Sequence, residues 1–253
     1  MLQHVSDDPQ WYSNPQNCHS IPFPFSFSES PERFSVQDGK FEYMGRTSFR
    51  QVHDKVSLLK RGGGTRFYIQ GSTGFGKSHI LAALACLLYR QSKIVVFIPD
   101  ARALLLSPIP YMQTALLCTF AAPSFIEERK RIRACKSLDD ISSFYHGLEF
   151  FPYLIVDQIN AFELSDLNTD AITRKKDDCR DFINDLSVGC FFITSASANY
   201  QTAMHMEKSQ TNETKLRLMG GMSTVSSQIY LFYPFYVVIN LGRDGAVVAP
   251  SRG

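Results

Sequence analysis

The stretch of sequence that decides the fold lies at residues 71–78. It reads, in order, Gly71, Ser72, Thr73, Gly74, Phe75, Gly76, Lys77 and Ser78. These residues fit the pattern G-x-x-x-x-G-K-[ST] at every fixed position. A short apolar segment at residues 66–70 precedes the stretch, and a segment rich in Leu and Ala at residues 77–90 follows it. We therefore expect a strand to enter this loop and a helix to leave it.

Each part of such a loop has a physical role in holding a chain of phosphates. Glycines let the backbone curl so that N–H groups face phosphate oxygens, and the helix N-terminus adds partial positive charge. Lys77 is expected to reach the β- and γ-phosphates, and Ser78 to ligate Mg²⁺. His79 is expected to be a helix residue near the phosphates rather than a base. A chance glycine-rich turn is the alternative, and the matching flanks argue against it.

A second motif follows about 80 residues later. Residues 153–156 form an apolar segment that ends in Asp157, as in strands that carry a magnesium-binding carboxylate. The next residue is Gln158, which can orient an attacking water but cannot accept its proton. This predicts slow hydrolysis, a base supplied from elsewhere, or a nucleotide-binding switch. Gln158 as an ordinary polar loop residue is the alternative.

A third apolar segment, at residues 190–194, runs into polar residues. Thr194, Ser195 or Asn199 could there contact the γ-phosphate or the water, and an ordinary polar turn is an equally weighted alternative. Asp100 and Arg102, after the apolar segment at residues 93–98, suit a kinase that binds an acceptor. A loop with a helix cap explains them better.

The chain divides into three parts. Residues 1–40 are rich in Pro, Ser and Asn and predict an irregular or disordered leader, with an arm that packs its Phe side chains onto the domain as the alternative. Residues 41–222 alternate apolar strands with helices, including one opened by a capping box at Ser137 and Asp140, which predicts a parallel sheet covered on both faces. Residues 223–253 form a tail of uncertain structure, expected to be a truncated or alternative C-terminus.

Composition excludes several classes of protein. Of the 253 residues, 44% are hydrophobic and 20% are charged, which excludes a disordered chain, a collagen and a coiled coil. The net charge of +2 gives no electrostatic support for nucleic-acid binding. Six dispersed cysteines predict neither a disulfide framework nor a zinc site. No classical signal peptide and no span of about 20 apolar residues is present, so an intracellular protein without a membrane partner is expected.

Five stretches together resemble a known family. They are GSTGFGKSHILAALACLL at residues 71–88, KIVVFIPDAR at 93–102, YLIVDQINAFE at 153–163, SASANYQT at 195–202 and KLRLMGGMS at 215–223. They are similar to the P-loop NTPase domain of Crinkler-type effectors and retrotransposon hot spot proteins, over residues 41–222.

The resemblance implies an ATPase of the additional-strand class. It also implies a hydrophobic-Gly-Arg box near the adenine, which falls here on Met44, Gly45 and Arg46. The resemblance further implies that glutamine at the position of Gln158 is usual in the family. Members commonly carry a nuclease-like domain after the NTPase, and some are secreted effectors that act in a host nucleus. Here only about 30 residues follow the matched region, too few for such a domain.

The sequence thus predicts a three-layer α/β P-loop NTPase with a mostly parallel sheet of the additional-strand type. Its expected function is Mg²⁺-dependent ATP binding with slow hydrolysis. A non-hydrolysing, nucleotide-gated interaction module, a P-loop small-molecule kinase and a nucleic-acid-acting effector are the alternatives. No arginine finger is evident, so Arg180, Arg217, a second protomer in a homo-oligomer or a protein partner is expected to supply one.

Overall fold

The structure is a computed structural model, and it describes residues 4–26, 30–61, 63–72, 74–163, 169–196 and 213–218. All of these residues belong to one unit. The tail predicted at residues 223–253 lies outside these ranges.

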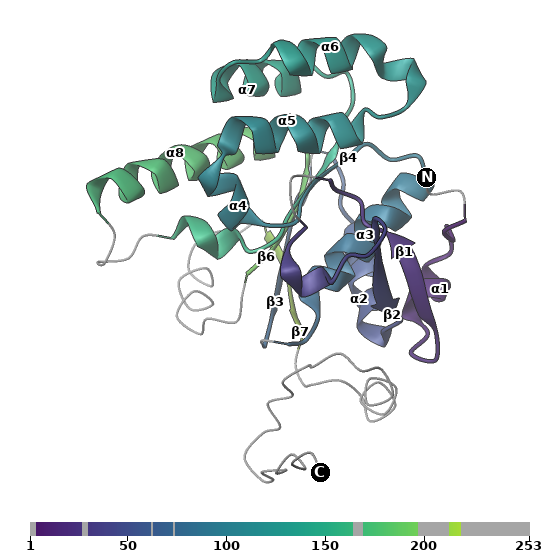
Figure 1. Ribbon diagram of the computed structural model, residues 1–253. Helices are drawn as coiled ribbons and strands as arrows, with labels where there is room; N and C mark the ends of the chain where they lie inside the picture. The colour runs from purple at the N-terminus through teal and green to yellow at the C-terminus, as the bar shows by residue number, and fades with distance from the viewer. Residues whose placement is uncertain are drawn as a thin grey trace, which may run out of the picture. The chain divides into compact units, whose positions relative to one another are not determined.

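A five-stranded parallel sheet forms the centre of this unit (Figure 1). Its strands are β3 (Arg66–Gly71), β4 (Val95–Ile98), β5 (Tyr153–Val156), β6 (Phe191–Ser195) and β7 (Glu213–Leu218). They lie in the order β4-β5-β6-β3-β7, and every neighbouring pair is parallel. One strand, β6, separates the strand that enters the glycine-rich loop from the strand that ends at Asp157. This order confirms the predicted additional-strand fold.

Helices cover both faces of the sheet. On one face lie α2 (Thr47–Ser57) and α3 (Lys77–Arg90), and on the other lie α4 (Ala101–Leu106), α5 (Pro108–Thr119) and α8 (Asp170–Leu186) (Figure 1). The chain crosses the sheet one way from β3 to β4 and returns through β5 to β6. Because parallel crossovers are right-handed, the two directions place their helices on opposite faces. Two further helices, α6 (Ile126–Ala134) and α7 (Leu138–His146), pack against α5.

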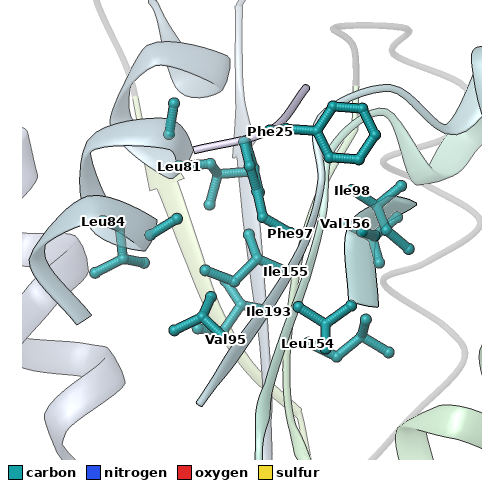
Figure 2. Close-up of a cluster of buried hydrophobic side chains, with 14 of the residues drawn as sticks. Phe25, Leu81, Leu84, Val95, Phe97, Ile98, Leu154, Ile155, Val156 and Ile193 are labelled. Carbon is teal, nitrogen blue, oxygen red and sulfur yellow. The ribbon is translucent and has the colours of Figure 1, made fainter. Parts of the chain in front are cut away.

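Both faces of the inner strands are buried. The strand register places Phe97, Ile155 and Ile193 in one row across three neighbouring strands. Figure 2 shows these side chains facing Leu81 and Leu84 of α3, while the alternate residues of the strands point to the other face. Every residue of α3 from 80 to 88 is buried, because the sheet covers one side and the N-terminal segment covers the other. Such a helix is apolar all round, as its sequence is.

The first forty residues differ from the predicted irregular leader. They contain α1 (Pro9–Ser13) and β1 (Cys18–Pro22), and β1 pairs antiparallel with β2 (Lys40–Met44). The ring of Phe23 lies 4.6 Å from that of Phe34 and 6.3 Å from that of Phe97, measured between centroids. The side chains of Tyr12, Phe23, Phe25 and Phe34 are buried in the core, so these residues form the arm that the alternative interpretation described. Burial of apolar area offsets the cost of ordering this proline-rich segment.

Local signals in the sequence are otherwise reproduced closely. The capping box between Ser137 and Asp140 is present at the start of α7, and Gly147 ends the helix. On α6, Glu127 pairs with Lys130 at 2.8 Å rather than with Arg131, which follows Glu127 by four positions. The guanidinium of Arg131 lies over the ring of Phe144 instead. None of the helices in the described ranges is long and apolar enough to cross a bilayer.

Candidate functional site

The loop at residues 71–78 connects β3 to α3 at the carboxyl end of the sheet. Its backbone has positive φ at Gly74 (78°) and Gly76 (84°), a conformation that favours glycine. Gly76 is also the N-cap of α3, so the loop passes directly into the helix N-terminus. Thr73 lies outside the described residues. The loop has the curled backbone and the helix start that phosphate binding requires.

Lys77 is the first residue of α3, and its side chain is only 8% exposed. Its Nζ donates to the carbonyl oxygens of Gly71 at 2.8 Å and Ser72 at 3.0 Å. Burial lowers the pKa of Lys77, and the nearby carboxylate of Asp157 opposes that shift. The ammonium of Lys77 is therefore hydrogen-bonded to the loop backbone and interacts electrostatically with Asp157. Ser78, beside it, is half-buried in the first turn of the helix.

Asp157 follows β5 and is 1% exposed. Its Oδ1 accepts hydrogen bonds from the hydroxyl of Ser195 and from the backbone N–H of Gln158 at 2.9 Å. Ser195 ends β6, whose pairing with β5 places the two residues side by side. The predicted Ser195 therefore contacts Asp157, whereas Asn199 lies outside the described residues. A buried carboxylate needs such donors, because an unpaired buried charge is costly.

Gln158 has a left-handed backbone, with φ of 60°. With the amide of Gln158 oriented so that both of its ends are satisfied, its nitrogen donates to Oδ1 of Asp100 at 3.3 Å and its oxygen accepts from Nη1 of Arg33 at 3.2 Å. Asp100 is also the N-cap of α4 and accepts from the backbone N–H of Arg102 at 2.9 Å, which confirms the helix-cap interpretation of these two residues. Gln158 is thus held by hydrogen bonds at the carboxyl ends of β4 and β5.

Arg33 is a site residue that the sequence did not reveal. Its guanidinium donates to Oδ2 of Asp100 at 3.1 Å, to Oδ2 of Asp157 at 3.3 Å and to the carbonyl oxygen of Pro99. It lies in the short 3-10 helix η1 (Glu32–Phe34), within the segment predicted to be irregular. No local motif surrounds Arg33, because its partners are more than 60 residues away in the chain. Only the fold brings them together.

The predicted Gly45 and Arg46 lie between β2 and α2, next to the glycine-rich loop. A Cβ at position 45 would overlap the backbone carbonyl of Asn14, so this close approach requires glycine. Nη1 of Arg46 donates to the carbonyl oxygen of Phe75, and the guanidinium packs against Gly76. The hydrophobic-Gly-Arg box is therefore in contact with the glycine-rich loop.

His79 lies on α3 behind the loop, with its ring 5.1 Å from that of Phe34 and 5.9 Å from that of Phe41. Burial, together with the positive charges of Arg46 and Arg33, lowers the pKa of His79 from 6.5 to about 3. His79 is therefore neutral at physiological pH. Its place on α3 agrees with the prediction that it is a helix residue.

The residues present fit a nucleoside triphosphate with its magnesium ion. Lys77 and Arg46 contact the loop, and Arg33 contacts Asp157. Asp157 and Ser78 supply oxygen ligands of the kind that Mg²⁺ takes. Within the part of the chain that the structure describes, Nε of Arg33 and Nε of Arg46 are buried without a hydrogen-bond partner. Buried donors without acceptors beside an amide-lined loop suit an anionic ligand.

Comparison with known proteins yields similarity to solved structures only. No family model matches the chain, and no curated protein matches its sequence. A replication initiator DnaA bound to AMPPCP and single-stranded DNA is 17% identical, with a TM-score of 0.36, over 74% of this chain and 49% of that chain. The ORC2 protein of Aeropyrum pernix, in ADPNP–ADP complexes, is 14% identical, with a TM-score of 0.40, over 69% and 47%.

A third similar structure, AMPPCP-bound DnaA from Aquifex aeolicus, is 14% identical with a TM-score of 0.35, over 78% of this chain and 51% of that chain. The chain spans about half the length of these proteins. The fold assignment rests on the strand order and on the loop itself. These make the unit an α/β P-loop domain of the additional-strand type.

Proposed function

We propose that this domain binds Mg²⁺·ATP and hydrolyses ATP slowly. The observation that carries the proposal is the convergence of Lys77, Asp157 and Ser195 at the carboxyl ends of β3, β5 and β6. Open α/β sheets bind ligands at this edge. The strand order supports the same conclusion, because it brings the loop and the carboxylate to opposite sides of one intervening strand.

The proposed roles follow from the chemistry of each side chain. The backbone of residues 71–76 cradles the phosphates, and Lys77 moves from its carbonyl partners to neutralise the β- and γ-phosphates. Ser78 and Asp157 hold the metal ion, Ser195 fixes the Asp157 carboxylate, and Asn199 is proposed to sense the γ-phosphate. Mg²⁺ bound there would neutralise charge that develops on the phosphate oxygens.

Slow turnover follows from Gln158. An amide can orient water, but it has no basic oxygen of the strength needed to accept a proton. Its hydrogen bonds to Asp100 and Arg33 hold it in place, so reorientation toward water must first break them. These same bonds favour the second candidate function, a nucleotide-gated interaction module that binds ATP without hydrolysing it.

The experiment that tests the proposal is ATP turnover by the purified chain, compared with Lys77→Ala and Gln158→Glu. Loss of turnover in Lys77→Ala establishes an ATPase, and faster turnover in Gln158→Glu shows that the missing base limits the rate. Lys55→Ala is the matched control, because Lys55 is an exposed lysine on α2. Binding without turnover in the wild type supports the nucleotide-gated module. Turnover that survives in Lys77→Ala contradicts the proposal.

A small-molecule kinase is the less favoured function. In the structure Asp100 caps α4 and pairs with Arg33, so its carboxylate is already engaged.

The predicted candidates for an arginine finger are Arg180 and Arg217. Arg180 pairs with Asp177 on its own helix, and Arg217 is exposed on β7. We therefore propose that Arg217, a second protomer in a homo-oligomer or a protein partner supplies the arginine finger. Size-exclusion chromatography with and without ATP tests the homo-oligomer, and an unchanged monomer peak counts against it.

The resemblance to Crinkler-type and retrotransposon hot spot proteins supports a narrower proposal, in which the domain is the NTPase module of an effector that acts in a host nucleus. The five quoted stretches alone carry it. Expression of a fluorescent fusion in host cells tests the proposal, and exclusion of the fusion from nuclei would count against it.

A further inference from the structure

Arg33 occupies a position that neither the loop nor the strand ends explain. It comes from the N-terminal segment, yet its guanidinium lies between the carboxyl ends of β4 and β5. Phe34, the next residue, is 2% exposed and packs against Phe23, Phe41 and His79. The packing of Phe34 fixes η1 beside the first turns of α3. It therefore keeps the side chain of Arg33 at the site whichever acceptors the guanidinium binds.

All four Nη hydrogens of Arg33 face acceptors. Nη1 faces Asp100 and Gln158, and Nη2 faces Pro99 and Asp157. Nε is buried and has no hydrogen-bond partner among the described residues. The guanidinium of Arg33 therefore already binds four acceptors, and its Nε is one further donor that an anionic oxygen could use.

The two oxygens of Asp157 are used differently. Oδ1 takes the hydroxyl of Ser195 and the N–H of Gln158, whereas Oδ2 takes Arg33. The charge of Asp157 also acts on Lys77, so two cations from distant segments converge on one carboxylate. A metal ion held by Asp157 would compete with Arg33 for Oδ2. Arg33 would then need another anionic partner, and the terminal phosphate of a bound triphosphate would offer the most negative charge.

We infer that Arg33, supplied in cis by the N-terminal segment, contacts the bound nucleotide. Arg33 recognises the γ-phosphate by exchanging its ion pair with Asp157 for an ion pair with that phosphate. Arg33 thereby makes the domain discriminate ATP from ADP, because ADP lacks this acceptor. The inference rests on the proposed nucleotide binding and adds to it the residue that sets the preference. No bond is made or broken in the exchange, apart from hydrogen bonds and ion pairs.

Isothermal titration calorimetry of ATP and ADP, each with Mg²⁺, tests the inference on the full chain. We expect the wild type to prefer ATP, and Arg33→Gln to lose about tenfold or more in ATP affinity, because the variant lacks a charge-assisted hydrogen bond to the γ-phosphate. Its ADP affinity should change less than about threefold, a difference of well under 1.4 kcal/mol. Arg33→Lys should be intermediate, because lysine keeps the charge without the fork of donors.

The matched control is Arg50→Gln. Arg50 is an exposed arginine on α2 that pairs with Asp54, and its removal should leave both affinities unchanged. Equal ATP and ADP effects in Arg33→Gln, or no effect, would overturn the inference and make Arg33 a structural residue. Tighter ATP binding in Arg33→Gln would also overturn it, because the arginine would then only compete with the metal. If Arg33→Gln fails to fold, Arg33→Lys decides, and an unchanged ATP preference there overturns the inference. A wild type that binds neither nucleotide refutes the proposed function itself.

Discussion

His79, half-buried behind the glycine-rich loop, should make this protein sensitive to acid. Burial beside Phe34 and Phe41, with two arginines nearby, lowers the pKa of His79 to about 3 in the folded state. In the unfolded chain the pKa returns to 6.5. At a pH between these two pKa values, His79 is protonated in the unfolded state and neutral in the folded state. The free energy of unfolding therefore falls as the pH falls from about 6.5 toward 3, by about 1.4 kcal/mol per pH unit.

The size of the effect follows from the two pKa values. Between pH 7 and pH 5 the protein should lose about 2 kcal/mol of stability through His79 alone. His79→Gln removes the titrating group, so its stability should decline less over the same range. Urea unfolding at pH 7 and pH 5, on the wild type and on His79→Gln, measures the difference between the two slopes. Absolute stability of the variant does not enter, because each protein is compared with itself.

His4→Gln is the control, since His4 is exposed and its replacement should leave the wild-type slope unchanged. Equal losses of stability in the wild type and in His79→Gln would contradict a lowered pKa of His79 in the folded protein. They would mean that the ring of His79 accepts a proton in the folded protein, and that the packing of η1 against α3 does not exclude it.

Three further predictions concern single contacts. Ser195→Ala removes a donor to the buried Asp157 carboxylate and should lower the free energy of unfolding by ~1.5–3 kcal/mol, measured in urea, whereas an unchanged midpoint would show that the contact is dispensable. Gly45→Ala places a methyl group against the Asn14 carbonyl and should cost about 1–3 kcal/mol by the same measurement, while a stability equal to wild type would contradict that close approach. Ser137→Ala breaks the capping box of α7 and should lower the thermal midpoint by an amount equivalent to ~1 kcal/mol, and no shift would show that the cap is not stabilising.

Much of the fold follows from local patterns. The glycine-rich loop, the apolar strand before Asp157 and the helix cap at Asp100 are each encoded within a few residues, so they can be read directly. The parallel sheet follows from continuously apolar strands, because only strands covered on both faces lack polar alternation. The order of the strands then places Ser195 next to Asp157.

The N-terminal segment could not be derived in the same way. Pairing of β1 with β2 joins residues more than 15 positions apart, and prolines near β1 suggested that no ladder forms. Strand β7 was also missed, although Leu216 and Leu218 alternate with charged residues as in a half-buried edge strand. Arg33 was missed because nothing near it in sequence marks a site. Its role depends on contacts that exist only after the arm has packed on α3.

Nucleotide binding at the loop is tested by calorimetric titration of the purified protein with Mg²⁺·ATP, beside Lys77→Ala. We expect saturable binding to the wild type and a loss of about tenfold or more in Lys77→Ala, because the ammonium contributes a charge-assisted contact of ~1.5–3 kcal/mol to the phosphates. No binding to the folded wild type, or equal binding to both proteins, would contradict this expectation.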